Sequence, residues 1–332
     1  MKYCVLIFII ALFANTLIVH AQCSNDSLMA IKGKWVKNTG SNSNKAKSPE
    51  TIKRMDQMLQ LLQSAYIPKG TEGKYWYNEQ TDRSLRKNIP LTYDLTADFM
   101  EYYCNSFQKN NNLKLGNETG DWFFIWANTF GRFAMEDMDF MIENKQVYQL
   151  TPQLGELNGF PLFAGADGNE LQGSNQFSRT ILISRQGQLP YTTVTRKQYL
   201  LAFLKYREDS YQKDIAYAQS QHNSISFWET AYQKDIQPAK EYLANQPEQE
   251  LAKPALLKPG NHKNDFKNFE NEDKGRMLIV VNESYFNSKP AAYVPQFVAV
   301  YWKWGGSTPG RNCGTMIEKN FDFKALQQML DK

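Results

Sequence analysis

The sequence predicts an α+β protein, in which a mostly antiparallel, aromatic-rich sheet has helices near residues 49–66, 196–245 and 322–331 packed on it. Helix-start signals and apolar residues at helical spacing mark the helical segments. Between them, aromatic and β-branched residues alternate with turn signals, which is typical of antiparallel strands. Aromatic residues make up 14% of the chain, which is an unusually high share.

The N-terminus has the three parts of a secretory signal peptide. Lys2 supplies the positive charge, residues 4–14 are apolar, and Val19 and Ala21 occupy the −3 and −1 positions of a cleavage site. We therefore expect residues 1–21 to be removed and the mature chain to be exported, to the periplasm or the extracellular space.

Two membrane-anchored alternatives fit the sequence less well. An uncleaved anchor would need about 20 apolar residues, and the apolar run is interrupted after residue 14. Lipid attachment at Cys23 would need a small residue directly before it and an aliphatic residue three before it. Gln22 and His20 stand there instead. No later apolar run approaches the length of a membrane span, so none is expected after signal cleavage.

The mature chain, residues 22–332, is long enough for a single large globular domain, and an internal boundary near residue 190 is the alternative. Its charges are balanced, because the full chain carries a formal net charge of +4 with Lys and Arg dispersed among Asp and Glu. Such a surface gives no support for nucleic-acid binding.

Four capping signals place the helices. Ser48 followed by Pro49 begins the first helix, and Thr195 with Gln198 forms a capping box that begins a helix over 196–221. A second capping box, formed by Ser226 and Glu229, begins a helix that runs towards Asn245 and is strained or broken at Pro238. Asp322 caps the last helix.

Strands are expected where short apolar runs lie between turn signals, at 73–78, 122–128, 178–184, 276–282 and 296–304, with a hairpin at 140–150 turning at 143–145. Four of these strands, at 122–128, 178–184, 276–282 and 296–304, are apolar on both alternating faces. We therefore expect both faces of the sheet to be covered. Trp122 and Trp126 share one face and are interpreted as core residues. The two helices between strands 178–184 and 276–282 leave a parallel pairing of these strands open.

Motifs for catalysis or metal binding are missing from the sequence. Only His222 and His262 remain after signal cleavage, and HExxH, CxxC, GxSxG and phosphate-binding loops are absent. Glu136, Asp137 and Asp139 form a carboxylate cluster that we interpret as a solvated acidic turn. We expect no metal and no cofactor, and the sequence does not decide whether the chain is an enzyme.

Three cysteines remain in the mature chain, Cys23, Cys104 and Cys313. An oxidising compartment allows one pair among them. Cys104 with Cys313 is the expected disulfide, because Cys23 lies at the terminus. The alternative is that no cysteines pair.

Trp302 and Trp304 are the candidate ligand-binding residues, because they lie near the end of a strand, before Gly305 and Gly306. Burial in the core is the competing interpretation, and the nearby Lys303 is interpreted as a solubilising residue. The expected function is non-catalytic binding of a partner or of an extracytoplasmic ligand such as a glycan. The alternative is an exported hydrolase that acts on glycans or peptides through two facing carboxylates.

Overall fold

The structure is a computed structural model that describes residues 24–39, 46, 48–80, 90–104, 113–117, 120–165, 177–258, 269–271 and 275–332. The predicted signal peptide and its cleavage site lie outside these residues. The chain divides into two compact units, with Met1–Phe133, Gln153–Arg185 and Ser288–Lys332 in unit 1 and Ala134–Pro152 and Gln186–Asn287 in unit 2. The sequence analysis expected one domain, with an alternative boundary near residue 190.

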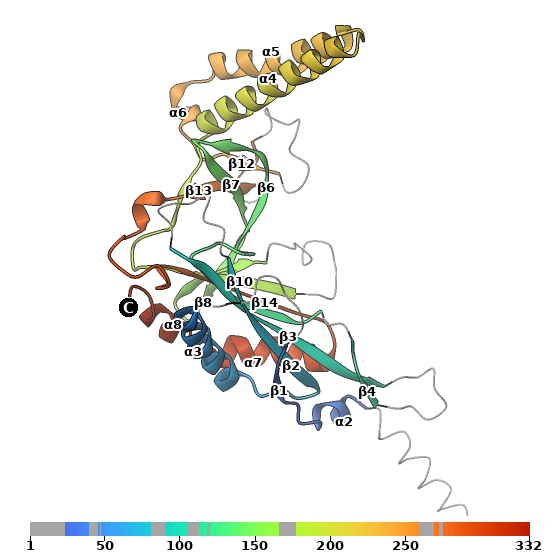
Figure 1. The fold of residues 1–332 in the computed structure, drawn as a ribbon, viewed down its shortest axis with the longest axis vertical. Helices are drawn as coiled ribbons and strands as arrows, with labels where there is room; N and C mark the ends of the chain where they lie inside the picture. Colours follow the sequence, from blue (N-terminus) through green and yellow to red (C-terminus); the bar gives the residue numbers. More distant parts are fainter. Residues whose placement is uncertain are drawn as a thin grey trace, which may run out of the picture. The chain divides into compact units, whose positions relative to one another are not determined.

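Unit 1 contains a nine-stranded sheet (Figure 1). The strand order is β1 (Trp35–Lys37), β2 (Thr71–Gln80), β3 (Thr92–Cys104), β5 (Trp122–Ala127), β14 (Val298–Trp304), β10 (Phe177–Ile183), β9 (Phe160–Ala164) and β8 (Gln153–Leu157), and β4 (Leu113–Leu115) pairs with β3. Only the β1–β2 pair is parallel among the described pairs of this sheet. The predicted mostly antiparallel, aromatic-rich sheet is therefore confirmed.

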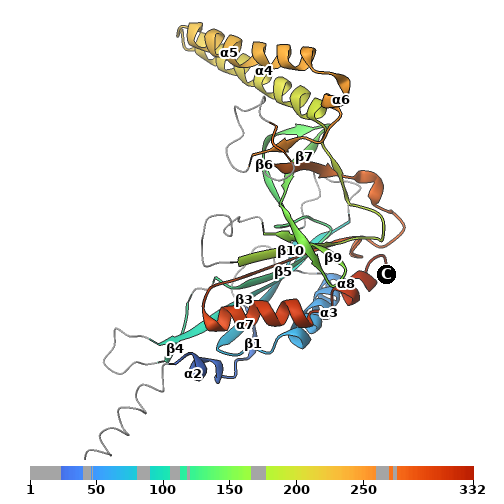
Figure 2. The ribbon, with the colours of Figure 1, turned by 180° about the vertical axis from the view of Figure 1, so that it is seen from behind.

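Three helices pack on one face of this sheet: α3 (Pro49–Ala65), α7 (Thr308–Asn320) and α8 (Phe323–Gln328). Figures 1 and 2 show them side by side, and the short α2 (Asn25–Met29) packs against α7. The predicted caps of α3 and α8 are confirmed, because the side chains of Ser48 and Asp322 accept hydrogen bonds from the first turns. Helix α7 was not predicted from the sequence.

Unit 2 contains a five-stranded sheet in the order β11 (Tyr191–Thr193), β13 (Arg276–Val281), β7 (Lys145–Leu150) and β6 (Ala134–Ile142), with β12 (Leu256–Leu257) paired to β13. The predicted hairpin is confirmed: β6 and β7 are joined by Glu143 and Asn144, which have φ angles of 51° and 62°. Such angles suit a two-residue hairpin turn. Strands β10 and β13 belong to different sheets, so the parallel pairing left open for 178–184 and 276–282 does not occur.

The helices of unit 2 are α4 (Arg196–Ser220), α5 (Ser226–Asn245), α6 (Glu248–Leu251) and the 3-10 turn η2 (Glu283–Tyr285). The capping box of Thr195 and Gln198 is confirmed, with Gln198 N to Thr195 Oγ1 at 3.2 Å and Thr195 N to Gln198 Oε1 at 2.9 Å. The predicted second capping box, at Ser226 and Glu229, is wrong, because α5 begins without a side-chain capping hydrogen bond. Pro238 lies inside α5, which continues past it.

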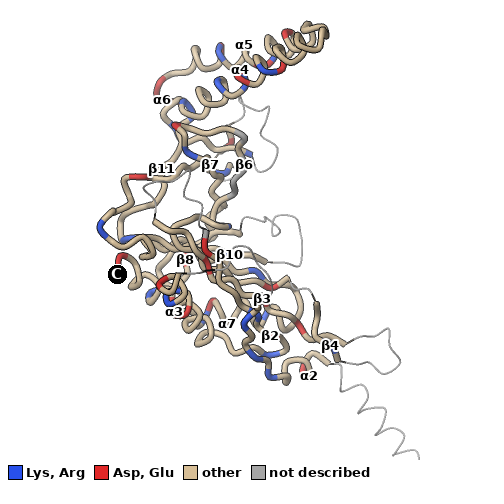
Figure 3. The backbone as a smooth tube through the Cα atoms, viewed as in Figure 1, with Lys and Arg blue, Asp and Glu red and all other residues tan. Residues whose placement is uncertain are grey.

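The charged residues of both units are mixed in sign. Figure 3 shows Lys and Arg interspersed with Asp and Glu along the backbone of each unit. Within the described parts of the chain, none of the helices has the length and apolar character needed to cross a membrane.

Candidate ligand-binding site

The face of the nine-stranded sheet opposite α3, α7 and α8 carries a row of aromatic side chains. Along β5, alternation turns Phe123 and Ile125 into the core with the helices. The same alternation turns Trp122, Phe124 and Trp126 to the opposite face, where all three are half-buried. No described helix of unit 1 covers them.

Strand register extends this row across the sheet. Phe124 lies opposite Tyr301 of β14 on one side and Thr96 of β3 on the other, and Thr96 lies opposite Trp76 of β2. The rings touch one another, since Phe124 stacks on Trp126 at 4.7 Å between centroids and lies 5.8 Å from Tyr301. We call the half-buried Trp76, Trp122, Phe124 and Trp126, together with the fully buried Tyr301 at their edge, the aromatic face.

The aromatic face corrects two predictions about tryptophans. Trp122 and Trp126 were assigned to a core covered on both sides, yet they are half-buried. Trp302 and Trp304 were assigned to a ligand groove, yet they are 1% and 9% exposed and belong to the core beneath the helices. Their burial rules out the groove proposed at these two residues.

The burial of Trp302 and Trp304 follows from α7, which begins directly after their strand. The indole N–H of Trp302 donates to Oε1 of Glu318 in α7 at 3.3 Å. Trp304 lies directly against Gly314 of α7, where an added Cβ would come within 2.5 Å of the indole. The chain therefore returns over the face on which the sequence analysis placed the candidate ligand groove.

Two basic side chains lie over the aromatic face. The guanidinium carbon of Arg132 is 5.2 Å from the Trp122 ring centroid, 5.7 Å from that of Phe124 and 5.5 Å from that of Tyr301. Nζ of Lys303 lies 5.0 Å from the same Trp122 ring. These distances allow cation–π attraction. Lys303 is only 8% exposed, so its interpretation as a solubilising residue is wrong.

Two carboxylates of β3 lie on the same face of the sheet. Asp98 stands between Lys74 of β2 and Trp122, and burial raises its pKa to about 6 although Lys74 opposes the shift. Burial also raises the pKa of Asp94, which accepts hydrogen bonds from Asn78 and Thr96 at 2.8 Å each. The alternation of Asp94, Thr96 and Asp98 with apolar residues was a strand signal that the sequence analysis missed.

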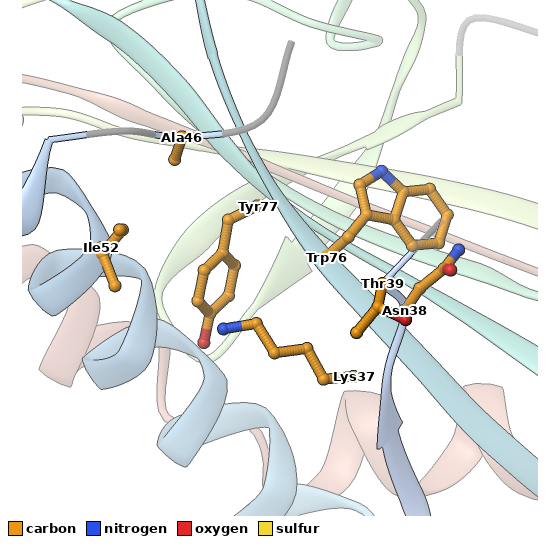
Figure 4. A pocket seen from close by; sticks show the side chains of 7 residues that line it. All are labelled: Lys37, Asn38, Thr39, Ala46, Ile52, Trp76 and Tyr77. Atoms are coloured by element: carbon orange, nitrogen blue, oxygen red, sulfur yellow. The ribbon is translucent and has the colours of Figure 1, made fainter. Parts of the chain in front are cut away.

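A pocket of about 210 Å³ lies at the edge of the sheet, where β1 ends and β2 continues (Figure 4). Lys37, Asn38, Thr39, Ala46, Ile52, Trp76 and Tyr77 line it. Nζ of Lys37 is 5.1 Å from the Tyr77 ring centroid, and the Tyr77 hydroxyl donates to Oδ1 of Asp56 at 2.6 Å. Tyr77 and Ile52 place the pocket on the side of the sheet that faces α3, whereas the adjacent Trp76 turns its ring to the opposite side (Figure 4).

A carboxyl pair, formed by the buried Asp121 and the half-buried Glu101, lies on the other side of the sheet, beneath α7. Asp121 is fully buried and accepts from the backbone N–H of Gly305, while the Ser307 hydroxyl donates to Oε1 of Glu101 at 2.6 Å. Burial, together with hydrogen bonding to and repulsion by Glu101, raises the pKa of Asp121 to about 8. Through Gly305 and Ser307, this pair holds the turn between β14 and α7.

The cysteines depart from the expected pairing. Cys313 is a free, buried thiol on α7, whereas Cys104 at the end of β3 is disulfide-bonded, so the predicted Cys104–Cys313 pair is wrong. Burial and the negative charges of Asp121 and Glu101 raise the pKa of the Cys313 thiol. The thiol lies in the core of unit 1.

The remaining residues considered in the sequence add no site. His222 is exposed, and His262 and the side chains of Glu136, Asp137 and Asp139 lie outside the described residues. Within the described residues, no group of three or more His, Cys, Asp or Glu side chains is placed to hold a metal ion. Neither a protein family, nor a curated protein, nor a solved structure matches this chain.

Proposed function

We propose that this chain is an exported, non-catalytic protein that binds a glycan along the aromatic face. The observation that carries this proposal is the row of rings in register on a sheet face that no described helix of unit 1 covers. Partly exposed aromatic rings offer flat apolar surfaces, and their burial by a ligand is favourable. Sugar rings have matching apolar faces.

Polar groups beside the rings support a hydroxyl-rich ligand. Asn38 and Thr39 line the pocket beside Trp76, and Asp98 lies next to Trp122 on the aromatic face. Binding sites generally combine apolar walls with a few polar groups that orient the ligand. The aromatic face extends from Trp76 across β3 and β5.

The carboxylates favour binding over hydrolysis. Glycosidases hold two carboxyl groups about 5–10 Å apart across the sugar. Asp94 and Asp98 are four residues apart on one strand, which separates them by about 13 Å. Glu101 and Asp121 contact each other directly beneath α7, where Asp121 is fully buried. Neither pair has the spacing and access that hydrolysis requires.

Ligand binding is tested by titrating the mature protein with a panel of neutral and acidic oligosaccharides, followed by intrinsic fluorescence and calorimetry. Trp76→Ala should weaken binding by about 1–3 kcal/mol if the ring is a stacking anchor. Trp228→Ala is the matched control, because this half-buried tryptophan lies on α5 in unit 2. A folded wild-type sample that responds to no oligosaccharide would contradict the proposal.

Export is tested separately by expressing the full chain in a secreting bacterium. Intact-mass analysis should show a mature protein that begins at Gln22 or Cys23 and carries no lipid. Retention of Met1, or a diacylglyceryl group on Cys23, would contradict the proposed processing.

A further inference from the structure

Cys104, at the end of β3, has a disulfide partner outside the described residues. The chain has four cysteines, Cys4, Cys23, Cys104 and Cys313. Cys313 is a free thiol, whereas Cys104 is disulfide-bonded, so these two are not joined to each other. Cys4 and Cys23 are the two remaining candidates, and both lie outside the described residues.

Processing of the N-terminus distinguishes these two candidates. Cys4 belongs to residues 1–21, which the proposed signal cleavage removes, whereas Cys23 stays in the mature chain as its first or second residue. We propose that Cys23 and Cys104 form a disulfide in the exported protein. This inference rests on the proposed export and is independent of glycan binding.

Contacts of the short helix α2 connect its surroundings to β3. Ser24, the residue after Cys23, caps α2, and its carbonyl oxygen accepts from the backbone N–H of Leu28 at 3.1 Å. The Leu28 carbonyl lies beside Gly70, where an added Cβ would be 3.1 Å from its oxygen. The Gly70 carbonyl in turn accepts from the backbone N–H of Tyr102 at 2.9 Å. Backbone contacts therefore lead from the residue next to Cys23 to the last turns of the β3 ladder.

The end of β3 lies at the same end of unit 1 as α2. Tyr102 and Cys104 are two residues apart on one strand, a separation of about 7 Å. Cys104 pairs with Leu113 of β4, and Figures 1 and 2 show α2 and β4 at one end of unit 1. A disulfide requires Cα atoms about 4–7 Å apart. The fold thus brings the start of the mature chain to the region that the bond requires.

The exposure of the two described cysteines agrees with this pairing. Cys104 is half-buried, so an oxidant can reach its sulfur, whereas Cys313 is 1% exposed. Formation of the bond is an oxidation by thiol–disulfide exchange. The two thiols lose two protons and two electrons and form one S–S bond, and a disulfide-bearing oxidant of the exporting compartment is reduced to its dithiol.

The bond has two consequences for the mature chain. Lipid attachment at Cys23 would use the same Sγ atom, so the disulfide and a lipid anchor exclude each other. The bond also closes a loop over residues 23–104, which contains α2, β1, α3, β2 and β3. Closing a long loop restricts the unfolded chain and stabilises the folded state.

The test begins with the protein purified from a secreting bacterium and alkylated in denaturant. Without reduction, iodoacetamide should modify one thiol, that of Cys313, and after reduction it should modify all three cysteines of the mature chain. Trypsin should release peptide 22–32 joined to peptide 88–109, and reduction should separate the two.

Variants separate the bond from the residues that form it. Cys23→Ser and Cys104→Ser should each leave the other cysteine open to alkylation and lower the melting temperature by several degrees, and the double variant should lose no more than either single one. In dithiothreitol, wild type and Cys23→Ser should melt at the same temperature. Cys313→Ala is the matched control, because it removes a cysteine and should retain the linked peptides.

Alkylation of Cys104 without reduction, or a bond from Cys104 to Cys313, would overturn the inference. Retention of Met1 would contradict the proposed export, and the retained chain would then be oxidised with glutathione disulfide and compared with its Cys4→Ser and Cys23→Ser variants. Cys23→Ser alone should free the Cys104 thiol, and release by Cys4→Ser instead would overturn the inference. Failure to bind any glycan would contradict the proposed binding function and leave the disulfide standing.

Discussion

Replacing Trp302 with alanine should destabilise unit 1 far more than replacing Trp122, because the two indoles lie on opposite faces of the sheet. Trp302 is 1% exposed, so the variant loses the burial of a side chain of roughly 200 Å². At about 25 cal/mol per Å², this corresponds to about 5 kcal/mol of the free energy of unfolding. Core substitutions of this kind typically cost about 3–5 kcal/mol.

Trp122 is half-buried, so Trp122→Ala loses roughly half of that transfer free energy, about 2–3 kcal/mol, including its contacts with Arg132 and Lys303. The two variants should therefore differ by about 2 kcal/mol in urea unfolding followed by circular dichroism. If Trp302→Ala does not fold, Trp302→Phe should still lose more stability than Trp122→Phe. Equal losses, or a larger loss at Trp122, would refute the assignment of Trp302 to the core.

Two further predictions concern stability. Because burial and the neighbouring Glu101 raise the pKa of Asp121 to about 8 although Lys303 opposes the shift, its contribution is fully present below the unfolded pKa of about 4 and is lost as the pH rises through about 8. Urea midpoints should accordingly fall from pH 6 to pH 8.5, and a slope that persists in Asp121→Asn would refute this. Thr195→Ala should cost about 1 kcal/mol in a thermal melt because it removes a formed capping box, whereas Ser226→Ala should cost under about 0.5 kcal/mol. Equal effects of these two substitutions would contradict the observed caps.

Local signals predicted much of the fold. Ser48, Thr195 and Asp322 begin helices as expected, because a cap involves only the side chain and the first turn. The hairpin at Glu143 and Asn144 is equally local. The capping box at Ser226 fails although its residue types are right, since Ser226 is already within the helix and its hydroxyl pairs with Ser224.

Helix α7 shows why other elements could not be predicted. It contains Gly310 and Gly314, which are weak helix formers. Tertiary packing explains both, because an added Cβ would lie 3.0 Å from the Asp121 carboxylate at Gly310 and 2.5 Å from Trp304 at Gly314. These glycines permit close approach of the helix to the sheet, a requirement that is invisible before the strands are placed.

The candidate site could not be predicted because it depends on that missing helix. Alternation correctly groups Trp302 with Trp304 and Trp122 with Trp126, since side chains two apart share a strand face. It does not say which face the helices cover. Because α7 covers Trp302 and Trp304, the candidate site lies on the opposite face of the sheet, which carries Trp122 and Trp126.

Strand β14 imposes an order on the assembly of unit 1. It lies between β5 and β10, so the strands made early in synthesis form two separate groups, β1 to β5 and β8 to β10, until the C-terminal segment arrives. Residues 186–287, which belong to unit 2, must be synthesised before β14 can join them. Contacts so distant in sequence form slowly. A nascent chain that lacks its last 40 or so residues thus presents two open strand edges, which are ready templates for pairing with other chains.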